Sequence, residues 1–313
     1  MRVVFLGNHR WSVPSLESLV ESSNQVVLVV TREPRPSGRG RALTQTVVAE
    51  AARRRGMPLA EVETVKEGRG FDAIANARPD ALVVVAYGEI LPERVLAVPS
   101  GAPVNVHFSL LPALRGAAPV QRAIMNGSTA TGVTTMRMTA GLDAGPIMRQ
   151  VATRIGSQED AGTLGDRLAD LGGAVLVDTL RDLADGTLEE RAQDESAVTF
   201  APKIERSDRE IDWAEPPEFV LRQIRALAPE PGAATSYRGR RLKITKASAR
   251  HSGPEAASHP GAVVRIETGE FAVASSVPGE FVAPAEVALE GRAKMSWEEF
   301  VRGHPPRPDE RLG

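Results

Sequence analysis

The 313-residue sequence contains no cysteine. This excludes disulfide bonds, thiolate zinc sites and cysteine nucleophiles, and it suits a protein of a reducing compartment. No apolar run approaches the length of a membrane span, and the first residues, MRVVFLGNHRW, lack the apolar core of a secretory signal. The formal net charge is only −2, which provides no general attraction to nucleic acids or membranes. We therefore expect a cytoplasmic enzyme or binding protein with no membrane partner.

The composition is that of a globular protein, with 42% hydrophobic and 25% charged residues. A chain of 313 residues is too long for one ordinary core, so two domains are expected. A charged segment with few apolar positions, Thr199–Trp213, separates two regions of different character. We place a catalytic domain at 1–205, with a connecting segment at its end, and a smaller domain at 206–313.

The first region alternates short apolar runs with segments of helical periodicity. This alternation predicts an open, doubly wound and mostly parallel α/β sheet of Rossmann-like type. The second region has short strands separated by turn residues, which predicts a small β-barrel of OB-like type. The segment Thr163–Gly186 contains internal glycines and predicts a helix pair or one long interrupted helix. The predicted buried strands of the first region are Arg2–Gly7, Gln25–Thr31, Asp80–Gly88 and Pro103–Phe108.

Two polar residues interrupt the last of these strands. Asn105 and His107 are two positions apart, so their side chains leave the strand on the same face. Ligands of parallel sheets bind beyond the carboxyl ends of the strands, where this pair lies. An amide and a protonated imidazole could together stabilise the oxyanion of a tetrahedral intermediate, and the histidine could also move a proton.

A carboxylate that could orient the histidine follows in the segment TAGLDAGPIM. Asp143 lies between Gly141 and Gly145, which allow a sharp turn and a close approach to a ligand. If the strand before it neighbours the strand of His107, Asp143 can face the imidazole, hold it protonated and accept a proton. Each residue alone has a simpler interpretation, as a polar core group or a turn residue. Only their joint placement indicates a transfer reaction through an oxyanion.

Several motifs resemble one known family, the folate-dependent formyltransferases. They are Asn105-x-His107, SLLP at Ser109–Pro112, the following RGAAPVQRAI, and GLDAGPI around Asp143. Further segments in the family's order, including APKIERSDREIDW and GRAKM, extend the resemblance over nearly the whole chain. These segments are closest to the branch of the family that formylates methionyl-tRNA.

The resemblance implies a reaction and a set of site residues. The formyl group of 10-formyltetrahydrofolate would pass to the α-amine of methionine on initiator tRNA, without metal or redox cofactor. Asn105 and His107 would stabilise the oxyanion, and Asp143 would hold His107 charged and help to remove the amine's proton. Folate would be bound by the SLLP segment and by the loop Val85–Leu91. In residues, this folate set is Ser109, Leu110, Leu111, Pro112, Val85, Tyr87, Gly88, Ile90 and Leu91.

Binding of tRNA would depend on arginines and lysines that meet phosphates. The segment Thr31–Arg41 carries four arginines against one glutamate, and we take Arg35, Arg39 and Arg41 as its substrate-binding residues. A solvated loop would have the same composition. Acidic and basic residues nearly balance over 207–313, whereas a tRNA-binding domain is more often basic.

The chain also departs from the family pattern where a substrate would be recognised. It has GNHRW at Gly7–Trp11 instead of a Gly-Thr-Pro turn, LTQTVV after the basic loop, and Ala234 where a tryptophan is usual. Two alternatives therefore stay open. One is a folate-dependent formyl or one-carbon transferase acting on a small amine, such as an amino sugar or a secondary metabolite. The other is a non-catalytic homologue that binds tRNA or folate.

Overall fold

The computed structural model describes residues 1–37, 42–252, 259–307 and 310–313. The chain forms two compact units. Unit 1 comprises 1–119, 130–154 and 165–202, and unit 2 comprises 120–129, 155–164 and 203–313. Among the described helices, none is long and apolar enough to cross a membrane.

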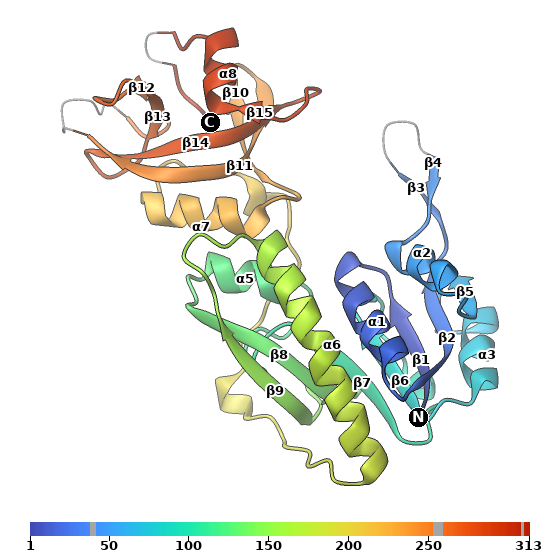
Figure 1. The fold of residues 1–313 in the computed structure, drawn as a ribbon. Helices are drawn as coiled ribbons and strands as arrows, with labels where there is room; N and C mark the ends of the chain where they lie inside the picture. Colours follow the sequence, from blue (N-terminus) through green and yellow to red (C-terminus); the bar gives the residue numbers. More distant parts are fainter. Residues whose placement is uncertain (38–41, 253–258, 308–309) are drawn as a thin grey trace. The chain divides into compact units, whose positions relative to one another are not determined.

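Unit 1 is built on one seven-stranded sheet (Figure 1). The strands β5, β2, β1, β6 and β7 pair in parallel, whereas β8 and β9 are antiparallel to their neighbours. The apolar runs in β1 and β6 are buried throughout because helices cover both faces of the sheet. In sheet order the strands are β5 (Leu59–Val62), β2 (Gln25–Arg32), β1 (Arg2–Gly7), β6 (Ala81–Val85), β7 (Ala102–His107), β8 (Ala130–Arg137) and β9 (Ile147–Arg154).

Helices on the two faces bury alternate residues of these strands. One core joins Val4, Leu6 and Leu82 of the sheet to Ile74 of one helix and Val95 of another. The other face is covered by the helix that follows β1 and by the long helix after β9, side by side in Figure 1. The helices of unit 1 are η1 (Arg10–Ser12), α1 (Val13–Glu21), α2 (Val47–Arg54), α3 (Gly68–Ala77), α4 (Glu93–Leu96), most of α6 (Ala161–Asp185), and η2 (Glu195–Ala197), whereas all but the first residue of α5 (Pro119–Met125) belongs to unit 2.

Helix α6 runs without interruption over the segment expected to break at its glycines. These glycines serve close packing instead. A Cβ on Gly165 would lie 2.0 Å from the ring of Trp11, and one on Gly173 would lie 2.4 Å from Ser18 Oγ. The helix therefore accepts glycines, which lower helix propensity, because only their small volume lets it approach its neighbours.

Unit 2 contains one antiparallel sheet, so the predicted fold class is confirmed: a mostly parallel α/β sheet followed by an antiparallel β domain. Its core includes Trp213, Tyr237 and Phe300, and Trp297 stacks on Phe300 at 5.4 Å. A capping box between Ser296 and Glu299 begins the last helix. The elements are η3 (Ser207–Arg209), α7 (Pro217–Leu227), β10 (Ala233–Tyr237), β11 (Arg240–His251), β12 (Val263–Arg265), β13 (Phe271–Ala274), β14 (Glu280–Leu289), β15 (Met295–Ser296) and α8 (Trp297–Gly303).

Candidate active site

Asn105 and His107 lie on an inner strand of the unit 1 sheet. Their strand, β7, pairs with β6 on one side and β8 on the other. Val106, between them, faces α6, because it lies within 3.0 Å of where a Cβ on Gly172 would be. Asn105 and His107 therefore use the opposite face, and only 5% of His107 is exposed.

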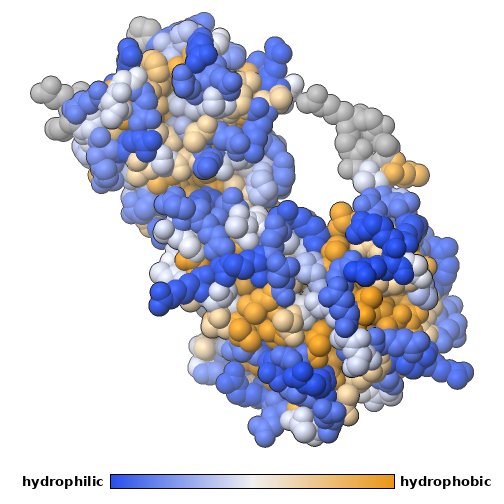
Figure 2. Space-filling model, viewed as in Figure 1, coloured by the Kyte–Doolittle hydropathy of each residue, from blue (hydrophilic) through white to orange (hydrophobic). Residues whose placement is uncertain are grey.

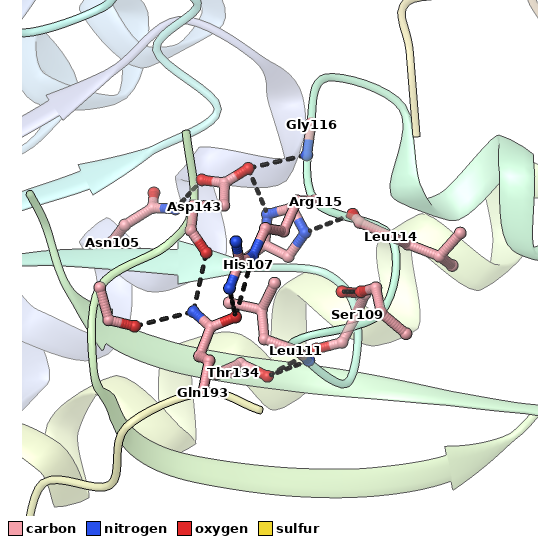
Figure 3. A network of polar contacts seen from close by, with 12 residues as sticks. Asn105, His107, Ser109, Leu111, Leu114, Arg115, Gly116, Thr134, Asp143 and Gln193 are labelled. Atoms are coloured by element: carbon pink, nitrogen blue, oxygen red, sulfur yellow. Dashed lines mark hydrogen bonds and ion pairs between the residues drawn. The ribbon is translucent and has the colours of Figure 1, made fainter. Parts of the chain in front are cut away.

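Asp143 reaches this face from the β8–β9 hairpin. Strand β8 does neighbour β7 but runs antiparallel, with Arg137 opposite Val104, so the hairpin starts beside the beginning of β7. The hairpin loop must turn back to bring its carboxylate to the pair. Figure 3 shows Asp143 between them, with Oδ2 3.6 Å from His107 Nδ1 and Oδ1 3.5 Å from Asn105 Nδ2. The three predicted catalytic residues thus form one cluster.

Backbone constraints hold Asp143 in this place. Its φ of 46° is in the left-handed region, and its Oδ2 accepts a 2.8 Å hydrogen bond from the Gly116 N–H. Gln193 Nε2 donates to the carbonyls of Asp143 and Gly145, each at 2.7 Å. A Cβ on Gly145 would lie 1.8 Å from the Arg137 carbonyl oxygen, so no other residue fits there without movement of the loop. Glycine is therefore required two residues after the carboxylate.

The hydrogen-bond partners of His107 define what its ring can do. Nε2 lies 2.9 Å from the Leu114 carbonyl, which can only accept, so Nε2 carries a proton. Nδ1 faces the Asp143 carboxylate, and a doubly protonated ring would donate in both directions. Side-chain exposures of 6% for His107 and 14% for Asp143 mean that water screens their interaction weakly. The site can therefore place a cation and the free amide hydrogen of Asn105 beside a developing negative charge.

Arg115 and Gln193 support the cluster and were not predicted from the sequence. Arg115 is 5% exposed and donates through Nε and Nη2 to Gln193 Oε1 at 3.0 and 2.8 Å. It also makes two hydrogen bonds to Glu195, at 2.8 and 3.2 Å. Arg115 belongs to the RGAAP motif, which was a usable signal. Gln193 follows Asp143 by 50 residues in a segment without periodicity, so no sequence signal identified it.

The SLLP segment forms a wall whose own side chains hold it together. Ser109 is fully buried and its hydroxyl donates to the Ala113 carbonyl at 2.6 Å. Leu111 packs with Met136 and Ile147, and its N–H donates to Thr134 Oγ1 at 3.2 Å. Leu110 and Pro112 are half-buried. A ligand at this wall would therefore meet backbone atoms and the two half-buried residues.

The loop that follows β6 starts beside Asn105, because Val84 pairs with Asn105. Val85, Tyr87 and Leu91 are buried, whereas Gly88 is exposed and Ile90 is 73% exposed. Burial, assisted by nearby Glu89, raises the pKa of the Tyr87 hydroxyl, which stays neutral. The backbone has positive φ at Ala86 and Gly88. This loop, which holds five residues of the predicted folate set, therefore presents its backbone and one large apolar side chain, that of Ile90, to solvent.

The basic segment forms a two-stranded hairpin of β3 (Arg35–Ser37) and β4 (Ala42–Thr44). Arg35 is exposed and pairs with Thr44 across the hairpin. The predicted substrate residues Arg39 and Arg41 lie outside the described residues. Within the described ranges, no three His, Asp or Glu residues gather as a metal site would require.

Comparison with known proteins identifies the family. The profile of the family described as formyl transferase matches residues 1–180, and that of the formyl transferase C-terminal domain matches 203–305. Methionyl-tRNA formyltransferase of Solibacter usitatus is 40% identical, with 100% of this chain and 99% of that protein covered. That of Bacillus velezensis is 38% identical over 100% of this chain and 98% of its own length.

A solved structure shares the fold at lower identity. It is an N-formyltransferase of Helicobacter canadensis in complex with folinic acid and dTDP-3-aminofucose, with a TM-score of 0.63 and 17% identity, over 91% of this chain and 98% of that one. Full-length identity near 40% with the curated relatives is far stronger support than shared fold. The chain therefore belongs to the formyl transferase family, in its methionyl-tRNA formyltransferase branch.

Proposed function

We propose that this enzyme transfers the formyl group of 10-formyltetrahydrofolate to the α-amine of methionine on initiator tRNA. The observation that carries the proposal is the cluster of Asn105, His107 and Asp143 beside the loop after β6, in a chain of this family. The curated relatives that bear the methionyl-tRNA formyltransferase name span essentially the same length as this chain. Initiation of protein synthesis in the cytoplasm would be its setting.

The three clustered residues would divide the chemistry. As the amine adds to the formyl carbon, negative charge develops on the formyl oxygen. The free N–H of Asn105 and the positive charge of His107 would stabilise that charge in a poorly solvated site. Asp143 would hold the histidine protonated and receive the proton that the amine loses, directly or through water. This proton would pass to the folate nitrogen as its bond to the formyl carbon breaks and tetrahydrofolate leaves. The gap of 3.6 Å between the two side chains is wide enough to tighten when substrates bind.

The loop Val85–Leu91 suits a folate. Ile90 offers an exposed apolar surface, and Ala86 and Gly88, which are both exposed, present backbone groups to solvent. Backbone donors and acceptors of this kind recognise the polar edge of a planar heterocycle, while apolar groups pack on its faces. Leu110 and Pro112 would form the opposite wall. When bound, the folate supplies the formyl group.

We propose that tRNA is bound through its phosphates by the arginines of the basic segment, Arg35 together with Arg39 and Arg41. Contacts with phosphates position a nucleic acid and require no particular base. Residues 206–313 would add a second binding surface, with 1–205 as the catalytic domain.

A small amine is the second candidate acceptor. Two observations favour it: basic and acidic residues nearly cancel over 207–313, and the Helicobacter neighbour was solved with an amino sugar nucleotide. A non-catalytic binding role is disfavoured, because a protein that only binds has no need to hold Asp143 in a left-handed conformation against His107.

An acceptor assay tests the proposal. Purified enzyme is incubated with 10-formyltetrahydrofolate and, in parallel, methionyl initiator tRNA or dTDP-linked amino sugars. We expect formyl-methionyl-tRNA, with rates that fall steeply as salt rises, because phosphate contacts release counterions. Formylation of an amino sugar alone would show that the acceptor is a small amine. No product with either acceptor would refute the enzymatic assignment.

A further inference from the structure

Asn8 joins three strands of the unit 1 sheet at their carboxyl ends. It follows β1 directly, and its Nδ2 donates to the Tyr87 carbonyl in the loop after β6. Its Oδ1 accepts the backbone N–H of Arg32, at the end of β2, at 2.8 Å, and the Thr31 hydroxyl, also at 2.8 Å. The amide orientation is set by its partners, since a carbonyl only accepts and a backbone N–H only donates.

From Asn8 the hydrogen bonds continue through Thr31 to Thr46. The single hydroxyl hydrogen of Thr31 is given to Asn8, so Thr31 Oγ1 must accept at its 2.6 Å contact with Thr46 Oγ1. Thr46 therefore donates there, and it accepts the N–H of Ala49 at 3.0 Å as the N-cap of α2. The donor and the acceptor of every hydrogen bond in this series are therefore assigned. Such series strengthen their members mutually, most of all where water is excluded, and Thr31 is fully buried.

The two threonines flank the β3–β4 hairpin, one before β3 and one after β4. Thr31 precedes β3 at the end of β2, and Thr46 follows β4 at the start of α2. Their contact closes the base of the hairpin that carries Arg35. The other end of the series is the carbonyl of Tyr87, in the loop that starts beside Asn105. One line of hydrogen bonds thus links two loops that no strand pairing joins.

We propose that Thr46, Thr31 and Asn8 form a positioning relay that fixes the base of the basic hairpin relative to the loop after β6. None of the three is a catalytic residue. The proposal rests on the proposed function, in which the hairpin binds the acceptor tRNA and the loop binds folate. The relay would then link the positions of both substrate-binding loops through one buried hydroxyl.

Three substitutions separate the parts of the relay. Asn8→Asp keeps an oxygen for Thr31 and Arg32 but turns a second oxygen toward the Tyr87 carbonyl, so the folate side is lost. Thr46→Val removes the hairpin side and leaves the bonds from Thr31 to Tyr87 intact. Thr31→Val removes the central link. Thr46 then loses its acceptor, so the hairpin side is lost, whereas Asn8 keeps the Arg32 N–H and the Tyr87 carbonyl as partners, so the folate side is only weakened. Loss of one such hydrogen bond corresponds to a change of about threefold to tenfold in a binding constant.

Steady-state kinetics with 10-formyltetrahydrofolate and methionyl initiator tRNA test the relay. We expect Asn8→Asp to raise the KM for folate and Thr46→Val the KM for tRNA, each about threefold to tenfold, with kcat within about twofold of wild type. Thr31→Val should raise the KM for tRNA by the same factor and the KM for folate by less than Asn8→Asp does, because Asn8 keeps its bond from the Arg32 N–H. If the three residues had only a structural role, all three variants would show a lower kcat or a lower folded fraction, and their effects would not separate between the KM for folate and the KM for tRNA.

Two matched variants complete the design. Thr131→Val removes another buried hydroxyl, one that has no hydrogen-bond partner among the described residues, and should leave both KM values unchanged. Thr46→Ser retains the hydroxyl and should restore the KM for tRNA. The relay is refuted if Thr31→Val leaves the KM for tRNA unchanged, or if Thr131→Val reproduces its effect.

The wild-type enzyme separates this inference from the proposed function. If wild type formylates methionyl-tRNA and the three variants fail to divide as stated, only the relay is wrong. If wild type does not formylate the tRNA, the proposed acceptor is wrong, and direct binding of folinic acid to Asn8→Asp still tests the folate side. Unchanged folinic acid affinity in that variant would then overturn the relay by itself.

Discussion

Replacement of Gly145 by alanine should misplace Asp143 without touching any reacting group. The added Cβ would lie 1.8 Å from the Arg137 carbonyl oxygen and 3.0 Å from its carbon. Ordinary contact begins near 3.4 Å, so the loop of the β8–β9 hairpin must move by more than 1 Å. Gln193 holds the carbonyls of residues 143 and 145 at 2.7 Å each, and such a movement breaks at least one of these bonds.

The expected result is a loss of kcat with the fold retained. Misplacement of a catalytic group by about 1 Å can cost about 10²-fold in rate. Overpacking of this kind costs about 1–3 kcal/mol of stability, which a domain stable by about 5–15 kcal/mol survives. Initial rates at saturating 10-formyltetrahydrofolate and methionyl-tRNA measure the first quantity, and thermal unfolding measures the second.

Gly141→Ala is the matched control in the same loop. Its added Cβ would lie 3.1 Å from Ala144 Cβ and 3.8 Å from Thr139 Oγ1, both side-chain atoms, and the position is exposed, so kcat should change less than about threefold. Wild-type kcat in folded Gly145→Ala, or an equal loss in Gly141→Ala, would show that the tight turn does not position the carboxylate.

Three further predictions follow from other contacts. Gln193→Leu removes both donors to the hairpin loop and should lower kcat about tenfold, whereas unaltered kcat would exclude a supporting role for this residue. Combined replacement of Arg35, Arg39 and Arg41 by alanine should raise the KM for tRNA and flatten its dependence on salt, with folate KM as the internal control. Arg122 donates two hydrogen bonds to Asp208 and lowers the pKa of that carboxyl, so the ionised form stabilises the fold above its ordinary pKa of about 3.9. Asp208→Asn should therefore reduce the free energy of unfolding by about 2 kcal/mol at pH 7, and this difference from wild type should vanish as the pH falls through the lowered pKa; a difference that persists in acid would contradict the ion pair.

The parallel strands β1, β2, β6 and β7 could be predicted because each contains an apolar run, which in β1 and β6 is buried on both faces. The edge strand β5 could not, since its four residues include one buried side chain and look like a loop. The glycines of α6 suggested an interruption, and only the neighbouring Trp11 and Ser18 show why the helix continues. Tertiary packing overrides local propensity at both places.

At the site, the two-residue period of a strand was enough to predict that Asn105 and His107 share a face. The approach of Asp143 depends on a hairpin loop that turns back along an antiparallel strand, and its path is set by Gln193 and Gly116. These contacts join segments far apart in the chain and have no periodic signal. The relay through Asn8 was likewise hidden, because one asparagine and two threonines are common in loops.

The account depends most directly on the charge of Asp143 beside His107. Asp143→Asn keeps the shape, but Gly116 and Asn105 donate to different oxygens of Asp143, and one of these becomes an NH2 donor in the variant, which also cannot take a proton from the amine. Single-turnover formylation of methionyl initiator tRNA is the decisive measurement, with folate and tRNA affinities determined separately. We predict a rate lower by about 10²–10³ with both affinities nearly unchanged. A rate within a few-fold of wild type in the folded variant would contradict the proposed mechanism.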